Sequence, residues 1–242
     1  MDEIRLNKFL SRAGVCSRRE ADRLIALGRV TVDGEKAAEG QKVAPDAEVF
    51  VDGKRAVLED EQILLVFHKP RGMVCTANSK QSPNNVISYL HLQKRVYMIG
   101  RLDKDSEGLL LLTNQGELAH RLQKPNFEHE KEYLVQTDRP FSDEFLEKMA
   151  SGVYLAELGV VTRPCQVIRE GVNLFRIVLK QGYNRQIRRM CDAFGVRVAR
   201  LTRVRIANIC LGDLGVGQYR AASVKEEKEL LKMLGLSGKD GN

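Results

Sequence analysis

Cysteine and histidine are scarce in this chain, and neither residue type is grouped. The five cysteines are an odd number spread along the sequence, and no two stand at the spacing of a zinc-ligand pair. The four histidines are equally dispersed. These absences argue against a disulfide scaffold and against a structural metal. We therefore expect a reduced, cytoplasmic protein that holds no metal ion.

Long apolar runs are also missing from the sequence. No stretch reaches the length of a signal-sequence core or of a membrane span, and charged residues occur within the first three positions. The sequence therefore predicts a soluble protein with no membrane partner. Internal repeats and low-complexity tracts are lacking too, and we expect only residues 237–242 to form a disordered tail.

The length of 242 residues and the hydrophobic content of 43% allow one large core together with a small satellite domain. Apolar spacing in the first part of the chain predicts helices over residues 6–13 and 17–27 and strands over 29–32 and 48–51. Ser17 begins a Ser-x-x-Glu capping pattern, and Asp33-Gly34 is a strong hairpin signal. These elements predict a helix-helix-strand domain over residues 1–53, followed by a linker over 54–62.

Residues 63–236 have the pattern of a second, larger domain, which opens with an apolar run typical of a buried strand. Further strands are expected over residues 132–136, 174–179, 196–201 and 205–211, and helices over 117–123, 143–150, 185–194 and 224–234. Ser142 and Asn184 are suitable helix N-caps. Because strands and helices do not alternate strictly, the order favours an α+β fold, a mixed sheet with flanking helices, over a doubly wound sheet.

Positive charge is concentrated in two regions, although the net charge of the whole chain is only +7. Residues 180–205 contain eight basic residues and one acid, a surplus equal to that of the entire chain, and residues 1–30 contain seven basic residues and four acids. A solvated helix face is the ordinary explanation of such a run. Here, however, the arginines of residues 185–189 are followed by four more over residues 197–205. Such a field is typical of a protein that binds the phosphate backbone of a nucleic acid.

A crowded, charged loop over residues 100–108 opens directly onto a very apolar segment. Asp103 and Asp105 are the two aspartates of this loop. Taken alone, they are as well explained by the shape of a turn as by catalysis. Their combination with the basic regions favours a functional role.

Four short motifs give the chain a recognisable pattern. They are Lys69-Pro70-x-Gly72, Gly100-Arg101-Leu102-Asp103 with Ser106-x-Gly108-Leu109, Lys131-x-Tyr133, and Asn184-Arg185-Gln186-Ile187-Arg188. In this order they resemble the bacterial ribosomal pseudouridine synthases, most closely the large-subunit type F enzymes. The resemblance spans nearly the whole chain, and it makes residues 1–53 similar to the RNA-binding domain of small-subunit ribosomal protein four.

The resemblance implies roles for individual residues. Asp103 corresponds to the nucleophile of the family, and Tyr133 to the tyrosine that packs against the target base and is a candidate for removing its C5 proton. Arg188 is expected to pair with the Asp103 carboxylate and orient it, and Arg101 to hold the phosphate beside the flipped nucleotide. Further RNA contacts are expected from Lys69, Asn184, Arg185, Arg189, Arg12, Arg18, Arg19 and Arg23.

The implied reaction suits these residue types. Pseudouridine forms when the bond from N1 to ribose breaks, the uracil turns, and C5 attaches to the same sugar carbon, so no cofactor is required. A carboxylate can hold either the sugar or the base covalently in between. An arginine fork beside it keeps the carboxylate ionised in a desolvated pocket. Flipping the base costs roughly a few kcal/mol, which stacking and phosphate contacts offset.

We therefore expect a monomeric RNA pseudouridine synthase that acts on a uridine in large-subunit ribosomal RNA, its small domain serving binding rather than chemistry. One alternative is a non-catalytic RNA-binding ribosome assembly factor, although the retention of Asp103, Tyr133 and Arg188 argues against it. A second alternative keeps the chemistry and changes the substrate to a transfer RNA or to small-subunit RNA. Only the resemblance separates this alternative from the first expectation.

Overall fold

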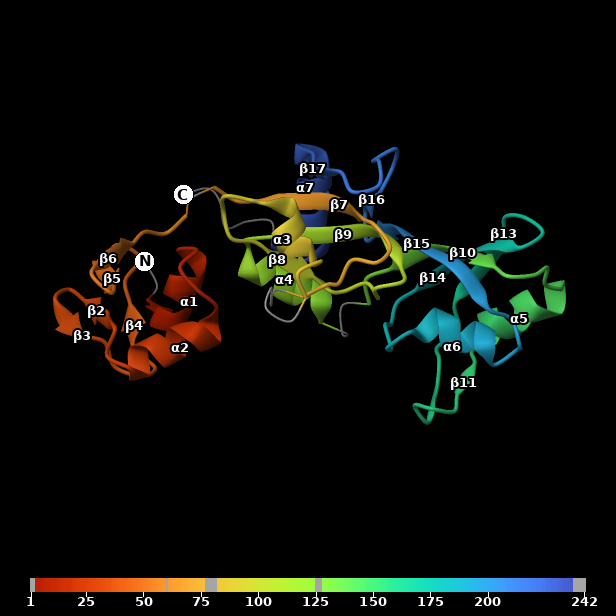
Figure 1. Cartoon of the computed structure of the whole chain (residues 1–242), viewed down its shortest axis with the longest axis horizontal. Helices are drawn as coiled ribbons and strands as arrows, with labels where there is room; N and C mark the ends of the chain where they lie inside the picture. Colours follow the sequence, from red (N-terminus) through yellow and green to blue (C-terminus); the bar gives the residue numbers. More distant parts are fainter. Residues whose placement is uncertain (1–2, 60, 77–81, 125–127, 237–242) are drawn as a thin grey trace. The chain divides into compact units, whose positions relative to one another are not determined.

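The computed structural model describes residues 3–59, 61–76, 82–124 and 128–236 (Figure 1). Two compact units make up the chain: the smaller contains residues 1–63 together with two short segments, 93–95 and 114–116, and the larger contains the remainder. The tail predicted over residues 237–242 lies outside the described residues.

The smaller unit begins with two helices, α1 (Leu6–Arg12) and α2 (Arg18–Ala26). As predicted, Ser17 caps α2 by accepting a hydrogen bond from the backbone N–H of Glu20 at 3.2 Å. Its strands are β1 (Ile4–Arg5), β2 (Val30–Val32), β3 (Glu35–Lys36), β4 (Lys42–Val43), β5 (Val49–Val51) and β6 (Lys54–Ala56). β1 pairs with β4, and the others form a sheet in the order β3-β2-β5-β6.

Two Asp-Gly turns shape that sheet. Asp33 and Gly34 both have positive φ, at 50° and 88°, and so do Asp52 and Gly53, at 49° and 75°. Two consecutive residues with positive φ are the requirement of a tight type I′ hairpin turn. The second turn leads into β6, so residues 54–56, predicted as the start of a linker, are part of the sheet instead. Their polar side chains gave a linker-like sequence because β6 is an edge strand.

The larger unit is built on a nine-stranded sheet. Its path is β13-β14-β10-β15-β9-β7-β17, with β16 beside β15 and β8 beside β9. The strands are β7 (Leu64–Lys69), β8 (Tyr97–Ile99), β9 (Glu107–Thr113), β10 (Lys131–Thr137), β13 (Gln166–Arg169), β14 (Leu174–Leu179), β15 (Val198–Ile206), β16 (Ile209–Cys210) and β17 (Tyr219–Ala221). A separate hairpin joins β11 (Tyr154–Leu155) to β12 (Val160–Val161).

The helices described alongside these strands are α3 (Val86–Leu90), α4 (Gly116–Gln123), α5 (Asp143–Ser151), α6 (Gln186–Asp192) and α7 (Val224–Met233). The α+β architecture with flanking helices is the one predicted. Ser142 caps α5 as expected, accepting from the backbone N–H of Phe145. Asn184 was a wrong choice of N-cap, because α6 begins after Arg185, whose φ is +53° and whose side chain makes no capping hydrogen bond.

The predicted strands over residues 196–201 and 205–211 also differ from the structure. β15 runs unbroken from Val198 to Ile206, through the gap between the two predicted strands, and the chain turns at Ala207, where φ is +50°, before the short β16. The arginines along this segment interrupt its apolar pattern, which is why the sequence suggested two strands rather than one.

The sheet of the larger unit consists of two halves that meet at a short seam. β15 runs parallel to β9 and pairs with it only at Thr202↔Glu107 and Arg203↔Gly108, whereas the other strand pairs are antiparallel. One core cluster packs α4 and α7 on the β7–β9 half, and another packs α5 and α6 on the β10–β14 half. Figure 1 shows β15, in blue, between β9 and β10. The loop that carries Asp103 enters β9 at this seam.

Candidate active site

The loop that carries Asp103 is held by its backbone. Asp103 itself is half-buried. The carbonyl of Lys104 accepts a hydrogen bond from the backbone N–H of Gly72 at 2.7 Å, and the N–H of Leu102 donates to Sγ of Cys75 at 3.4 Å. Ser106 N–H donates back to the carbonyl of Asp103 at 3.1 Å, which closes the turn. The loop is therefore fixed without use of the Asp103 carboxylate.

Two buried cations, Lys69 and Arg203, bind backbone carbonyls of the loop. Lys69 is fully buried, and its Nζ donates to the carbonyls of Ser106 at 2.8 Å and Pro70 at 2.9 Å. Burial lowers the pKa of Lys69, and the negative charge of Asp103 acts in the opposite direction. The predicted contact between Lys69 and RNA is therefore wrong for this structure, since the ammonium faces backbone carbonyls inside the fold.

Arg203 is the second of these cations and is 3% exposed. Its Nε donates to the carbonyl of Leu109 at 2.7 Å and its Nη1 to the carbonyl of Arg101 at 3.4 Å. It thus joins the two ends of the loop across the seam. Its Nη2 is buried without a hydrogen bond in the described part of the chain, so the positive charge of Arg203 is only partly compensated.

Arg188 lies beside the same loop but does not pair with the carboxylate that was predicted. Its Nε is 3.3 Å from Oδ2 of Asp105, its Nη2 donates to the carbonyl of Asp105 at 3.1 Å, and its Nη1 donates to the carbonyl of Val198 at 3.0 Å. Burial lowers the pKa of Arg188, and the charges of Asp105 and Asp103 oppose that effect. The expected ion pair with Asp103 is replaced by one with Asp105, because the turn directs Asp105 toward α6.

Arg185 adds a second cation to Asp105, with its Nη1 at 3.1 and 3.2 Å from the two carboxylate oxygens. Burial alone would raise the pKa of Asp105, but the hydrogen bond from Arg185 and the charge of Arg188 hold it below its usual value. The carboxylate of Asp103, by contrast, makes no hydrogen bond or ion pair within the described ranges. Arg101 is exposed beside it.

Strand pairing places Tyr133 next to the seam between β15 and β9. It stands on β10 opposite Arg203 of β15, and Arg203 in turn stands opposite Gly108 of β9. Tyr133 is partly buried and packs on the core cluster beneath α5 and α6. Lys131, two residues earlier on the same strand, therefore shares its face of the sheet. Burial lowers the pKa of Lys131, and the charge of Arg203 lowers it further.

The continuous basic field predicted over residues 185–205 is divided in the structure. A bulge between Glu132 and Tyr133 places Arg205 opposite Glu132 and Arg203 opposite Tyr133, so the two arginines face opposite sides of the sheet. Arg205 donates to Glu132 at 2.7 Å, and Arg200 donates to the buried Glu107 at 2.5 Å. Arg203 and Arg205 are thus held in contacts within the fold, whereas Arg200 stays exposed at the surface despite its ion pair. The predicted nucleic-acid surface is therefore smaller than the whole of residues 185–205.

The remaining predicted RNA contacts are distributed as follows. Asn184 is exposed next to Arg185, and Arg189 of α6 forms an ion pair with Glu157. In the smaller unit, Arg12, Arg18 and Arg19 are exposed on α1 and α2, whereas Arg23 pairs with Glu20 at 2.6 Å.

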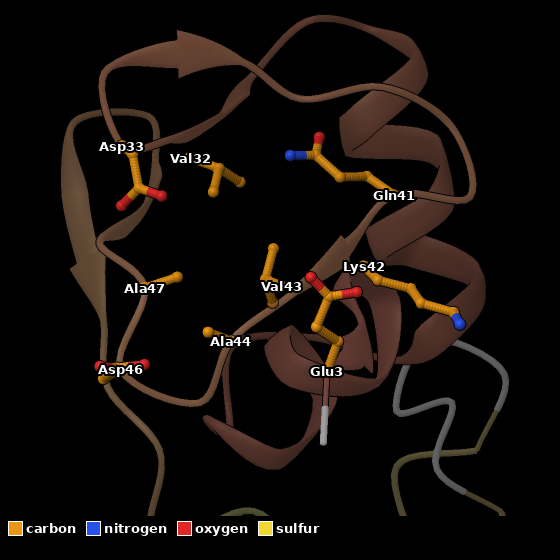
Figure 2. Close-up of a pocket in the computed structure, with 9 residues that line it drawn as sticks. All are labelled: Glu3, Val32, Asp33, Gln41, Lys42, Val43, Ala44, Asp46 and Ala47. Atoms are coloured by element: carbon orange, nitrogen blue, oxygen red, sulfur yellow. The ribbon is translucent and has the colours of Figure 1, made fainter. Parts of the chain in front are cut away.

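A pocket in the smaller unit, seen in Figure 2, has more acidic than basic residues in its lining. Three carboxylates, those of Glu3, Asp33 and Asp46, line it together with the single cation Lys42. This charge balance does not suit phosphate groups. Within the ranges that the structure describes, no group of three or more His, Cys, Asp or Glu residues is placed to hold a metal ion, and no helix is long and apolar enough to cross a membrane.

Known proteins match both units. A family model described as RNA pseudouridylate synthase matches residues 63–193, and one described as S4 domain matches residues 4–49. The dual-specificity RNA pseudouridine synthase RluF of Salmonella typhi is 43% identical over 95% of this chain and 79% of its own length. This chain belongs to the RNA pseudouridylate synthase family. An uncharacterized RNA pseudouridine synthase of Mycobacterium leprae is 39% identical over 96% of this chain and 94% of its own length.

A solved structure described as pseudouridylate synthase agrees with these matches: its TM-score is 0.67, and 26% identity extends over 95% of this chain and 99% of that one. The protein is thus an RNA pseudouridine synthase, an isomerase whose substrate is RNA, with an S4 domain at its N-terminal end. The family resemblance drawn from the four motifs is confirmed.

Sequence reasoning missed the residues that support the loop of the synthase. Arg203 was counted as part of a surface field, and Asp105 was named as a functional candidate without any contact of its own. Lys131, which shares the face of Tyr133, was also left without a role. The Lys-x-Tyr spacing was a usable signal for Lys131, since residues two apart on a strand share a face. For Arg203 no local signal exists, because its burial depends on the contact between β15 and β9.

Proposed function

We propose that the synthase isomerises a uridine of large-subunit ribosomal RNA with Asp103 as its nucleophile. The observation that supports this best is a half-buried carboxylate without hydrogen bonds in the described structure, at a seam where cations converge. The charge of Asp103 acts on the pKa of three of them, Lys69, Arg185 and Arg188. These cations place positive charge around the carboxylate that attacks.

The chemistry of Asp103 follows from this arrangement. In attack on the sugar, a carboxylate oxygen donates an electron pair to C1′ while the bond from C1′ to N1 breaks and its pair leaves on the uracil. The uracil turns, C5 forms its bond to C1′, and the carboxylate departs with the pair it had shared. The C5 proton is then removed and N1 gains a proton. Attack on the base is the alternative route, and both routes use the carboxylate of Asp103.

Other residues take supporting roles in this proposal. Tyr133 stacks on the flipped base and is the candidate to remove the C5 proton, because it lies across β15 from the loop that carries Asp103. Arg101, exposed beside the nucleophile, holds the phosphate next to the target nucleotide. Arg188 supplies positive charge to the site through its contacts with Asp105. Arg12, Arg18 and Arg19 of the S4 domain bind the RNA backbone.

Transfer RNA is a second candidate substrate. The observation in its favour is the name dual-specificity RNA pseudouridine synthase, which the relatives from Salmonella typhi and Escherichia coli carry. Large-subunit ribosomal RNA remains the first candidate substrate because the motifs resemble those of the large-subunit enzymes. The cytoplasmic location and the monomeric state stay predictions.

The test of this proposal measures tritium released from C5 of uridine in large-subunit ribosomal RNA, with RNA binding measured alongside. We expect Asp103→Asn to abolish release while RNA affinity stays close to that of the wild type. Asp213→Asn, a change at an exposed carboxylate of the larger unit, serves as the control and should behave as wild type. Full turnover by Asp103→Asn would contradict the assignment. Tight binding without turnover by the wild type would favour the assembly factor.

A further inference from the structure

We propose that the hairpin of β11 and β12 is a further RNA-binding element of the synthase, on which Tyr154 stacks against an unpaired base of the substrate outside the active site. The inference rests on RNA being the substrate of the synthase, and it does not depend on which residue is the nucleophile.

The hairpin has apolar residues on both of its faces. Tyr154 pairs with Val161 and Leu155 pairs with Val160, so each pair shares one face. Leu155 is 2% exposed and, like Val160, packs in the core cluster of α5 and α6. Tyr154 and Val161, on the opposite face, are 61% and 63% exposed. Because a sheet face left in water ordinarily carries polar side chains, this outer apolar face indicates a partner that covers it.

The backbone of the hairpin is fixed at both of its ends. At the base, the N–H of Val153 donates to Oγ1 of Thr162 at 2.9 Å, and the N–H of Thr162 donates to the carbonyl of Val153 at 2.9 Å. At the tip, the carbonyl of Leu155 accepts a hydrogen bond from the N–H of Leu158 at 3.0 Å. The outer face is therefore in place before a partner binds, and stacking on it costs little conformational entropy.

The hairpin lies beside the helix that borders the active site. Figure 1 shows β11 next to α6, and Glu157 in the hairpin loop forms an ion pair with Arg189 of that helix. Arg188 of α6 in turn contacts the loop that carries Asp103. With seven residues at roughly 1.5 Å each, α6 is about 10 Å long. A nucleotide close to the target uridine in the RNA can therefore reach the hairpin while the uridine is in the site.

The outer face fits a base better than it fits a phosphate or a protein. The arginines next to the hairpin are paired, Arg189 with Glu157 and Arg163 with Glu128, so they offer no surplus of positive charge. A tyrosine ring beside a valine has the size of one base, whereas a stable protein interface buries roughly 800 Å² on each partner. Every unpaired base has a flat aromatic face that can stack on such a ring.

The first experiment measures single-turnover rates against the concentration of large-subunit ribosomal RNA for variants of the full-length protein. Tyr154→Ala should raise the RNA concentration that gives the half-maximal rate by about 5- to 100-fold, the loss expected for one stacked base. The rate at saturating RNA should be kept, because the reacting groups are unchanged. Tyr154→Phe keeps the ring and should stay close to the wild type. Tyr219→Ala removes an exposed tyrosine from β17, in the other half of the sheet, and is the matched control.

The salt dependence of binding distinguishes stacking from a contact with the RNA backbone. A tyrosine ring releases no counterions from RNA, so Tyr154→Ala should leave the slope of log affinity against log salt unchanged. A lower slope would show that the variant has lost a phosphate contact, and it would contradict stacking.

The lack of tryptophan in the chain allows a direct optical test. Tyr154→Trp introduces a single indole on the outer face of the hairpin, and Tyr219→Trp introduces one at the control position. Because a base stacked on an indole quenches its fluorescence, we expect RNA to quench Tyr154→Trp and to leave Tyr219→Trp unchanged.

Three further results would overturn the inference: wild-type RNA affinity in Tyr154→Ala, an equal loss of affinity in Tyr154→Phe, or equal fluorescence changes at positions 154 and 219. Thermal melting of each variant separates these results from unfolding, and Tyr154→Trp provides the test if Tyr154→Ala does not fold. Failure of the proposed function is distinguishable, because the wild type would then not turn over large-subunit ribosomal RNA, and the fluorescence test would be made with transfer RNA.

Discussion

At the scale of single residues, the site of the synthase depends on cations that are bound to backbone carbonyls. Arg203 joins the carbonyls of Leu109 and Arg101, and Lys69 binds the carbonyl of Ser106. Carbonyl oxygens satisfy donors but do not cancel charge, so positive potential remains around the loop. The same contacts that fix the loop therefore keep two cations beside the segment that carries Asp103.

Arg203→Lys tests this dual role. An ammonium retains the charge but cannot reproduce the fork that reaches two carbonyls on different strands. We expect the free energy of unfolding to fall by about 1–3 kcal/mol, as for a buried group that loses a hydrogen-bonding partner. The single-turnover rate should also fall, and RNA affinity should be nearly unchanged. Urea denaturation measures the first effect, with the exposed Arg197→Lys as the control. Wild-type stability and rate would show that the fork has no such function.

The sequence predicts part of this site. Motif order proposes Asp103, Tyr133 and Arg188, because each lies in a short pattern with little freedom, and these assignments stay predictions. The motifs could not show that Arg188 pairs with Asp105 rather than with Asp103. The two carboxylates are two residues apart in one turn, and the direction of the turn decides which of them faces Arg188. Nor could the motifs predict that Lys69 is buried, because a charged residue at the end of an apolar run is ordinarily exposed.

At the scale of elements, the seam between β9 and β15 is the critical contact. Gly108 has φ of +106°, and a Cβ atom added there would stand 2.3 Å from the carbonyl oxygen and 2.6 Å from the nitrogen of Arg203. Both neighbours are backbone atoms that cannot turn aside. The glycine therefore allows the two half-sheets to meet at the point where the loop carrying Asp103 begins.

Gly108→Ala should consequently be severe. We expect the free energy of unfolding to fall by about 3 kcal/mol or more, from steric overlap together with backbone strain. Gly212→Ala is the matched control: φ there is +59°, but no atom lies within 4 Å of the added Cβ. Its cost should be only about 1 kcal/mol, the conformational part alone. Equal losses for both variants, measured by urea denaturation, would contradict the close approach at the seam.

Helix α7 offers a pH-dependent test. Glu226 closes a capping box with Ser223 and pairs with Arg220, and these contacts lower the pKa of Glu226 to about 2 despite the opposing effect of burial. Because the folded-state pKa lies below the unfolded value near 4.5, the carboxylate stabilises the fold above that pH. Its contribution is then lost as the pH falls from about 4.5 toward 2.

The corresponding variant is Glu226→Gln. At pH 7 it should lower the free energy of unfolding by up to about 3 kcal/mol, since each pKa unit corresponds to about 1.4 kcal/mol. The gap between variant and wild type should narrow progressively below pH 4.5, as denaturant titrations across the range would show. A gap that is constant from pH 7 down to pH 3 would contradict the ionised pair.

The predicted strand ranges are right where the sequence has one apolar pattern and wrong where charged residues interrupt that pattern. Strand β14 matches its predicted range, Leu174–Leu179, because it is a short apolar run that only Arg176 interrupts. β15 was divided in two because arginines interrupt its apolar residues, and their charges are compensated by Glu107, Glu132 and the carbonyls of the loop. Such compensation comes from distant parts of the chain and cannot be found in a local window.

At the scale of the whole molecule, the protein joins an S4 domain to a synthase domain, and each has its own core. The combination of Arg12→Gln, Arg18→Gln and Arg19→Gln should weaken RNA binding and lower the slope of log affinity against log salt by about 2–3, roughly one per lost phosphate contact. The single-turnover rate at saturation should be kept. Lys36→Gln with Lys54→Gln, on the sheet of the same unit, is the control. Loss of the chemical step at saturating RNA would contradict a role in binding alone.

We propose that the synthase isomerises one particular uridine of ribosomal RNA with Asp103 as its nucleophile. An experiment in cells tests this proposal. Carbodiimide-dependent reverse-transcription stops map pseudouridines across total RNA from a strain lacking the protein, and from the same strain carrying the wild type or Asp103→Asn. We expect one site in large-subunit ribosomal RNA to be lost in the deletion strain and restored by the wild type alone. An unchanged map, or restoration by Asp103→Asn, would contradict it.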